Sequence, residues 1–237
     1  MKFKLLFFVY VVFLYIFAFG SPVKEMLAGK NQIFEEDSSA IKEVEYLEST
    51  GTQYIDTGYI PNSKTKCLCS VEVLALSAYW YNPVFGCGTA YNGNNIFCIA
   101  ICQSAYEGFF YRGNNFNKVI YNALSIGDMV RFVTSPTMYG IENITKGQNY
   151  YQNYINPIYT EGNETLFLFA GNVPGTRDLN HATRIRVYHF EIFEDDEIIH
   201  ELIPVREGTN GYMYDIVTGE KFQNIGTGDF IIGPDKE

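Results

Sequence analysis

Three short segments combine aromatic rings with amide side chains, a combination suited to binding sugars. A flat ring stacks on the apolar face of a pyranose, while Asn and Arg side chains satisfy its hydroxyl groups. Aromatic residues and Asn-Gly turns recur throughout this chain, so these residues are also consistent with packing and turns. The residues that we expect to bind a ligand are Tyr79, Trp80, Tyr81, Tyr91, Asn94, Tyr111, Arg112 and Asn114.

The carboxylates raise the question of glycoside hydrolysis, and their spacing argues against it. A retaining glycosidase needs two carboxylates that face one groove, about 5 to 5.5 Å apart. The acidic run at residues 194–197 is consecutive and lies in a predicted turn, and Glu191 is expected on the opposite sheet face from Glu194. The sequence therefore predicts that the protein is not an enzyme, with a glycoside hydrolase as the less favoured hypothesis.

The three histidines, His181, His189 and His200, lie near no nucleophile signature. His189 and His200 are placed to meet across one hairpin, but no further ligand is supplied by spacing, so no metal site is assigned. A second tyrosine-rich stretch, residues 149–154, is polar enough to indicate a loop with exposed rings.

Five cysteines lie within 36 residues of one another, and they are candidates for disulfide bonds or for small buried side chains: Cys67, Cys69, Cys87, Cys98 and Cys102. On an extended strand Cys98 and Cys102 are about 13 Å apart, beyond the ~7 Å that a bridge allows. Any bridge must therefore join two different strands, and the odd number leaves at least one thiol unpaired.

The elements that must position these residues are predicted to be strands. The chain contains 19 Tyr, 19 Phe and 21 Gly residues with 19% charged residues, which favours twisted strands joined by tight turns. From Arg186 the alternation places Tyr188, Phe190 and Ile192 on one face and Val187, His189 and Glu191 on the other. The runs that predict strands are residues 66–76, 95–102, 108–112, 128–134, 165–170, 184–193 and 197–205.

Residues 184–233 have the pattern of strand, turn, strand, glycine loop and closing strand, and residues 45–58 (EYLESTGTQYIDTG) form an opening motif. In this order the chain resembles the concanavalin A-like, laminin G-like jelly-roll domains of secreted bacterial, phage and protist proteins. The resemblance covers about residues 43–233. It departs at Asp195-Asp196, where relatives often carry an Asn-Gly type pair, and at Val205, where many carry a cysteine.

The resemblance implies a fold, a class of ligand and a metal ion. The fold is all-β, an antiparallel β-sandwich of two sheets with concanavalin A-like jelly-roll topology. Glu43 and Glu45 would lie on its outer or edge strand. Such sandwiches often hold Ca²⁺ at the rim, and the candidate oxygen ligands in this chain are Asp215, Asp229, Asn224 and Asn172.

Two lysines followed by fifteen uncharged residues open the chain, which is typical of a secretory signal at residues 1–20 with cleavage between Gly20 and Ser21. An uncleaved anchor is the alternative. We expect a linker at residues 21–42, the sandwich domain at 43–233 and a tail at 234–237. The location is then extracellular or the cell surface, where Asn143 and Asn163 are candidate glycosylation sites.

Together these features predict a secreted recognition module that binds carbohydrate or a cell-surface glycan without chemistry. The alternative is an extracellular protein-interaction or structural module of the cell envelope. The formal net charge of −10 repels phosphates and argues against nucleic acid as a partner. Exposed rings would favour the glycan hypothesis, whereas a flat apolar patch or an open strand edge would favour docking of a protein.

Overall fold

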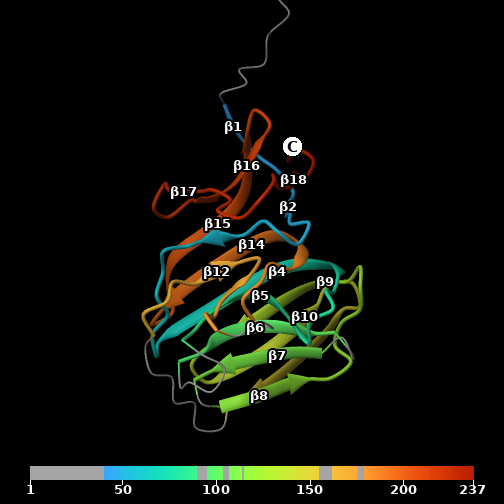
Figure 1. Cartoon of the computed structure of the whole chain (residues 1–237), viewed down its shortest axis with the longest axis vertical. Coiled ribbons are helices and arrows are strands. Elements are labelled where there is room, and N and C mark those ends of the chain that lie inside the picture. Colours follow the sequence, from blue (N-terminus) through green and yellow to red (C-terminus); the bar gives the residue numbers. More distant parts are fainter. Residues whose placement is uncertain (1–39, 90–94, 104–106, 114, 155–161, 176–178) are drawn as a thin grey trace, which may run out of the picture. The chain divides into compact units, whose positions relative to one another are not determined.

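The computed structural model describes residues 40–89, 95–103, 107–113, 115–154, 162–175 and 179–237, which belong to one compact unit. Every regular element in these ranges is a strand, and the strands form two sheets (Figure 1). All pairings are antiparallel except that of β13 with β5. The predicted all-β sandwich of two sheets is therefore confirmed.

The larger sheet has eleven described strands, of which eight form a continuous order and three pair alongside it. In order these are β11 (Gln148–Asn153), β10 (Met138–Asn143), β9 (Met129–Thr134), β4 (Thr65–Ala75), β14 (Arg184–Glu194), β15 (Glu197–Glu207), β16 (Asn210–Asp215) and β17 (Lys221–Phe222), with β1 (Ile41–Glu43), β2 (Leu47–Glu48) and β18 (Ile231–Ile232) beside them.

The smaller sheet has seven described strands, and β5 lies near its centre. In order these are β3 (Ile55–Asp56), β12 (Phe167–Leu168), β5 (Tyr81–Cys87), β6 (Phe97–Cys102), β7 (Glu107–Arg112) and β8 (Asn115–Ile120), with β13 (Gly171–Asn172) paired to β5.

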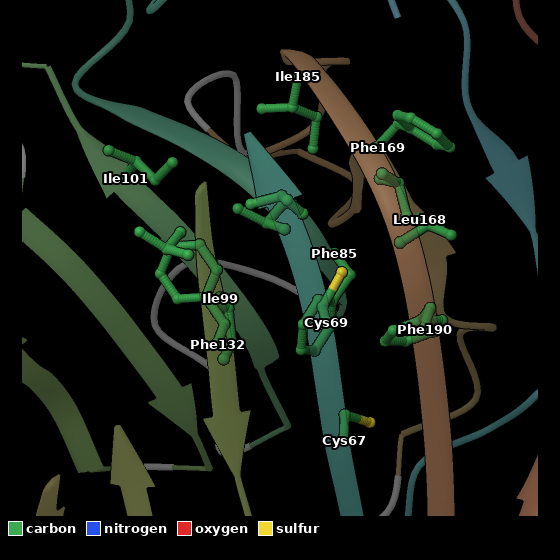
Figure 2. Close-up of a cluster of buried hydrophobic side chains, with 14 of the residues drawn as sticks. Cys67, Cys69, Phe85, Ile99, Ile101, Phe132, Leu168, Phe169, Ile185 and Phe190 are labelled. Atoms are coloured by element: carbon green, nitrogen blue, oxygen red, sulfur yellow. The ribbon is translucent and has the colours of Figure 1, made fainter. Parts of the chain in front are cut away.

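The core lies between the two sheets and is built from alternate residues of their strands. In β4 the side chains of Cys67, Cys69 and Val71 are buried while the residues between them are partly exposed, the period expected of a half-buried strand. Across the core, Phe85 of β5 meets Phe190 of β14 with ring centroids 5.0 Å apart (Figure 2). Burial of these apolar faces supplies the main driving force for folding.

Strand β14 departs from the predicted alternation because it contains a β-bulge. The register with β4 shifts between Val187 and His189, so Tyr188 is the extra residue. Val187 and Phe190 are both buried, while Tyr188, His189 and Glu191 are half-buried. The prediction that Tyr188 shares a face with Phe190 is therefore wrong, and the bulge places Tyr188 and His189 outside the core.

The tyrosine-rich stretch that was expected to be a loop is instead strand β11. It pairs with β10 over six residues and ends the described order of the larger sheet. The expected exposure of rings is confirmed at Tyr151, whereas Tyr150 is half-buried. The polar composition reflects the position of an edge strand, where few side chains need to be buried.

All five cysteines are buried, and none of them forms a disulfide bond. Cys67, Cys69 and Cys87 lie in the core between the sheets. Cys98 and Cys102 lie in a second cluster, with Ile96, Ala100 and Leu179 among its members, on the other face of β6. The candidate disulfides are therefore not formed in this structure, and the cysteines act as small buried side chains.

The turn between β14 and β15 is built by Asp195 and Asp196, which both have positive φ, at 49° and 64°. This is the backbone of a two-residue hairpin of the type that favours Asn-Gly. Lys64 pairs with Asp195 and Lys66 with Asp196 at 3.5 Å, so both carboxylates meet cations of the adjacent segment.

Candidate functional site

Trp80, the only tryptophan of the chain, lies at the surface with 61% of its area exposed. It stands immediately before β5, and its carbonyl accepts a hydrogen bond from the backbone N–H of Gln103 at 3.0 Å. A large aromatic ring held outside the core leaves apolar surface in water, which is the condition for stacking on a ligand. Packing in the core is therefore not the role of Trp80.

Hydrogen bonds of Asn82, whose side chain is fully buried, stabilise the loop that carries Trp80. The Asn82 carboxamide accepts a hydrogen bond from the N–H of Ser77 at 2.7 Å and donates to the carbonyls of Tyr79 at 3.3 Å and Ile101 at 3.4 Å. Asn82 therefore satisfies backbone groups of the loop that would otherwise be unpaired in the interior. The exposed indole stands on a structured loop.

Beside Trp80, the ring of Tyr79 lies against the imidazole of His181, with centroids 4.4 Å apart. The Nε2 atom of His181 also lies 3.4 Å from the Ser77 hydroxyl. His181 in turn lines a small cavity of about 120 Å³ together with Asn180 and the stacked rings of Tyr54 and Phe167. Tyr79, the residue before Trp80, thus contacts a histidine that lines a cavity together with an amide. We call Tyr79, Trp80, Asn180 and His181 the Trp80 surface.

Three other residues of the predicted ligand site lie elsewhere in the packing. Tyr81 is half-buried and makes edge contacts with Phe109 and Tyr111, with centroids 4.9 and 5.8 Å apart. Tyr111 itself is buried. Arg112 is also buried, and its guanidinium donates hydrogen bonds to backbone carbonyls, including Thr65 at 2.9 Å. Tyr111 and Arg112 are therefore structural, and their predicted placement on a ligand surface is wrong.

The remaining predicted residues lie outside the described ranges. These are Tyr91, Asn94 and Asn114 of the ligand site and Gly20 and Ser21 of the signal cleavage site. Among the residues that are described, no helix is long and apolar enough to cross a membrane.

A groove of about 470 Å³ on the outer face of the larger sheet gathers ionisable groups that the sequence did not connect. The Nε2 atom of His189 lies 3.1 Å from a carboxylate oxygen of Glu201, and its Nδ1 atom lies 3.7 Å from Glu191. Glu191 and Glu201 are direct cross-strand partners on β14 and β15. The groove is lined by Glu43, Glu45, Ser70, Met129, Tyr188, His189, Glu201, Ile203 and Lys236.

Asp215, one of the calcium candidates, is the last residue of β16, and its side chain is fully buried. Its carboxylate accepts hydrogen bonds from the Glu201 N–H at 2.9 Å and the Thr218 hydroxyl at 2.7 Å, and lies 2.7 Å from the Nδ1 atom of His200. Burial alone would raise the pKa of Asp215, but these contacts and the N–H of Val217 hold it below its ordinary value. Asp215 is thus a structural residue of the turn.

The other calcium candidates are placed as follows. Asn172 donates a hydrogen bond to the carbonyl of Thr165 at 3.0 Å, so it supports a loop of the smaller sheet. Asn224 and Asp229 line the same cavity near the C-terminus. Within the described residues, no three His, Cys, Asp or Glu side chains are grouped in a way that could hold a metal ion.

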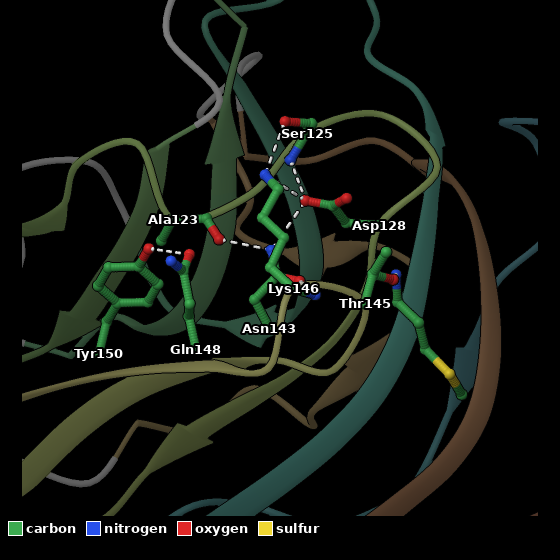
Figure 3. A network of polar contacts seen from close by, with 9 residues as sticks. Ala123, Ser125, Asp128, Asn143, Thr145, Lys146, Gln148 and Tyr150 are labelled. Carbon is green, nitrogen blue, oxygen red and sulfur yellow. Dashed lines mark hydrogen bonds and ion pairs between the residues drawn. The ribbon is translucent and has the colours of Figure 1, made fainter.

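The two glycosylation sequons differ in accessibility. The side-chain amide of Asn143 is buried and donates to the carbonyl of Ala123 and to Asp128, both at 2.8 Å (Figure 3). Its oxygen accepts the N–H of Lys146 at 2.9 Å. A glycan on this nitrogen is incompatible with these bonds, so Asn143 is not an acceptor in the folded protein. Asn163 is exposed.

Comparisons with known proteins give a likeness of fold. No family model and no curated protein sequence matches the chain. The chain is similar to the crystal structure of a Bacteroides ovatus "putative carbohydrate binding protein", with a TM-score of 0.52 and 8% identity over 83% of this chain. The match spans 61% of that protein's length. At this identity the comparison shows a shared β-sandwich fold.

Two peptidases are also among the solved structures to which this chain is similar. They are Scytalido-glutamic peptidase (TM-score 0.41, 14% identity, 80% of this chain and 100% of that chain) and an Eqolisin family peptidase (0.38, 14%, 74% and 92%). The expectation that this protein is not an enzyme is corrected by this finding and is withdrawn. In the groove beside His189, Glu191 and Glu201 come together from two strands, which the linear spacing did not indicate.

Proposed function

We propose that this protein binds carbohydrate, as a concanavalin A-like sandwich that recognises a glycan, and that the Trp80 surface is the binding site. The observation that carries the proposal is the exposure of Trp80, at 61%, on a loop held by buried hydrogen bonds of Asn82. A loop backbone that is already held in place need not be ordered when a sugar stacks on the ring that it carries, which lowers the entropic cost of binding.

The neighbours of Trp80 supply the polar half of sugar recognition. The exposed Asn180 carries both a donor and an acceptor, and His181 lines the adjoining cavity. Each pyranose hydroxyl is likewise a donor and an acceptor, so amide and imidazole groups beside an aromatic face match its chemistry. An extracellular location, with a glycan of a cell surface as the partner, belongs to the same proposal.

A glycan array with the purified protein tests the proposal when it is run beside Trp80→Ala and Asn180→Ala. We expect binding to a defined class of glycan that Trp80→Ala reduces by about tenfold, because removal of the indole removes the apolar surface on which the sugar stacks; loss of about 1.4 kcal/mol of binding free energy corresponds to this factor. Tyr121→Ala is the matched control, since Tyr121 is an equally exposed aromatic residue at 64%.

Loss of binding in both aromatic variants would point to a general effect on the protein and not to the Trp80 surface. Binding that Trp80→Ala leaves unchanged would contradict the proposed site, and an array without signal from folded protein would contradict the proposed function.

A second candidate function is hydrolysis of a glycosidic bond at the groove beside His189. The observation that favours it is the direct pairing of Glu191 with Glu201 across β14 and β15. Side chains opposite each other on antiparallel strands lie on the same face of the sheet, and a glycosidase needs two carboxyl groups that face one groove. His189, in contact with both, would then stabilise the ionised member of the pair.

Release of reducing ends from soluble β-glucans and from the glycans bound on the array tests this second candidate. We expect Glu201→Gln to abolish turnover and Glu220→Gln, at an exposed position, to leave it unchanged. Turnover that survives Glu201→Gln would exclude this groove as the catalytic site.

A further inference from the structure

A second cavity lies between the start of β16 and the chain segment that leads to β18, and it has a volume of about 340 Å³. This volume is at the lower end of the range that holds small ligands. Its walls are Asn210, Gly211, Tyr212, Gln223, Asn224, Gly226, Gly228, Asp229 and Phe230. The sequence did not predict that any of these residues binds an organic ligand.

One wall of the cavity is a loop that is fixed before any ligand arrives. The Asn224 side chain accepts the N–H groups of Tyr54 at 3.1 Å and Gly226 at 2.8 Å and donates to the carbonyl of Gly228 at 2.6 Å. A Cβ atom at Gly226 would lie 2.0 Å from the carbonyl oxygen of Thr52, so only glycine allows this approach. The loop is therefore docked rigidly on the segment before β3.

The same docking is reinforced by Gln53 and Thr52. The buried Gln53 side chain donates to the carbonyl of Thr227 at 3.0 Å, and the Thr52 hydroxyl donates to the same carbonyl at 2.8 Å. The backbone N–H of Thr227 returns a hydrogen bond to the carbonyl of Thr52 at 3.0 Å. A wall fixed in this way presents its polar groups at constant positions, which lowers the entropic cost of binding.

The polar side chains that line the cavity have hydrogen-bonding capacity left over. Within the described part of the chain, Asn210, Gln223 and Asp229 take part in no side-chain hydrogen bond or ion pair. Tyr212 adds an aromatic ring to the same cavity, with the ammonium of Lys221 5.7 Å from its centroid. Two amides, one carboxylate and one ring thus converge on a single space.

We propose that this cavity binds one neutral sugar unit, with Tyr212 against its apolar face and Asn210, Gln223 and Asp229 on its hydroxyl groups. Amides offer donors and acceptors in equal measure, and a carboxylate accepts two hydroxyl hydrogen bonds, so the set matches a polyol. Asp229 is the only ionisable acid or base among the lining residues apart from the tyrosine, and the nearby Lys221 is already paired with Glu207 at 2.8 Å. Asp229 therefore disfavours uronic and sialic acids by repulsion.

This inference deepens the proposed function and rests on it, because it takes the ligand to be a carbohydrate. It concerns a different surface, however, since no residue of the Trp80 surface lines this cavity. Binding at the two sites can therefore be tested separately. A glycan that reaches both would gain affinity from two linked contacts.

Saturation-transfer NMR with methyl glucoside, methyl galactoside, methyl mannoside and glucuronic acid tests the inference. We expect at least one neutral glycoside to bind, Gln223→Ala and Tyr212→Ala each to weaken it by roughly two- to tenfold, and glucuronic acid to bind more weakly. Asp229→Asn keeps the shape of the side chain and removes its charge. It should therefore reduce the difference in affinity between the neutral glycoside and glucuronic acid. Asn149→Ala, an exposed amide on β11, is the matched control.

The outcomes separate this inference from the function proposed above. Glycoside binding that Trp80→Ala abolishes, or that Tyr212→Ala and Gln223→Ala leave unchanged, would overturn the cavity site while leaving the Trp80 surface intact. Binding lost in the cavity variants and kept in Trp80→Ala would support the cavity. An absence of glycoside binding to protein that binds a glycan on the array would also overturn it.

Discussion

The buried side chain of Asn82 donates a hydrogen bond to the backbone carbonyl of Tyr79, 3.3 Å away, directly before the exposed Trp80. The same side chain accepts a hydrogen bond from the N–H of Ser77, so one amide joins two backbone positions of the loop. The position of the indole thus depends on a residue that the ligand would not touch.

Replacement of Asn82 by Ala should lower both stability and glycan binding. The loss of its hydrogen bonds leaves buried backbone groups unpaired, which costs about 1–3 kcal/mol in the free energy of unfolding. We expect a lower denaturant midpoint, measured by urea unfolding. We also expect the folded variant to bind the array glycan more weakly, because the loop that positions Trp80 loses its hydrogen bonds. Ala78→Ser, at an exposed position of the same loop, should change neither. Full binding by Asn82→Ala would show that the loop does not need this support.

Asp196→Gly should stabilise the hairpin between β14 and β15. Asp196 has φ of 64°, a conformation that glycine adopts without the cost imposed by a side chain. The ion pair with Lys66 that would be lost is exposed and contributes little. We expect a gain of about 0.5–1 kcal/mol in the free energy of unfolding, by the removal of strain at positive φ. A loss of stability in urea unfolding would mean that the ion pair outweighs the strain.

The buried carboxylate of Asp215 should make the fold sensitive to acid. Its pKa is held below the ordinary 3.8, because hydrogen bonds to the charged form outweigh its burial. The stability that it contributes is therefore complete above pH 3.8 and is lost as the pH falls through the lower pKa of the folded protein. Thermal unfolding between pH 7 and pH 2 measures this loss.

In the same series, Asp215→Asn should be less stable than the unmodified protein at pH 7 by about 1–3 kcal/mol, since an amide group faces donors that the carboxylate satisfied. The difference between the two proteins should shrink below pH 3.8. Asp229→Asn, at an exposed carboxylate, is the control for a general effect of charge. A constant difference across the whole range would assign no role to the ionisation of Asp215.

The five buried thiols should resist modification until the protein unfolds. Burial raises the pKa of the Cys67 and Cys87 thiols, which keeps them protonated and unreactive, and it also excludes the reagent. We expect mass spectrometry after alkylation in denaturant without reductant to find five modified cysteines, and the native protein to remain unmodified over the same time. Two fewer modifications in denaturant would reveal a disulfide that the structure does not contain.

The long strands were predicted well, because the alternation of their apolar and polar side chains can be read without knowing which strand lies beside them. The runs that became β4, β14 and β15 are found within two residues of their predicted ends. The bulge at Tyr188 was not predicted, since a bulge is defined by the register with the neighbouring strand. The pairing of Glu191 with Glu201 across β14 and β15 depends on the same kind of information.

The candidate site was predicted in part, for a related reason. Aromatic residues of similar sequence context separate in the structure, with Trp80 at the surface and Tyr111 in the second buried cluster. Arg112 is buried because three backbone carbonyls, those of Asn62, Ser63 and Thr65, accept its guanidinium, and their approach is a tertiary contact. Composition alone does not distinguish such a residue from one that meets a ligand.

Intrinsic fluorescence during titration with the glycan selected on the array is the decisive test of sugar binding at Trp80, because Trp80 is the only tryptophan in the chain. We expect a saturable shift of the emission to shorter wavelength and protection of the indole from quenching by acrylamide, since a bound sugar covers a ring that is now 61% exposed. Binding measured by calorimetry with no change in emission or quenching would place the ligand elsewhere and contradict binding at Trp80.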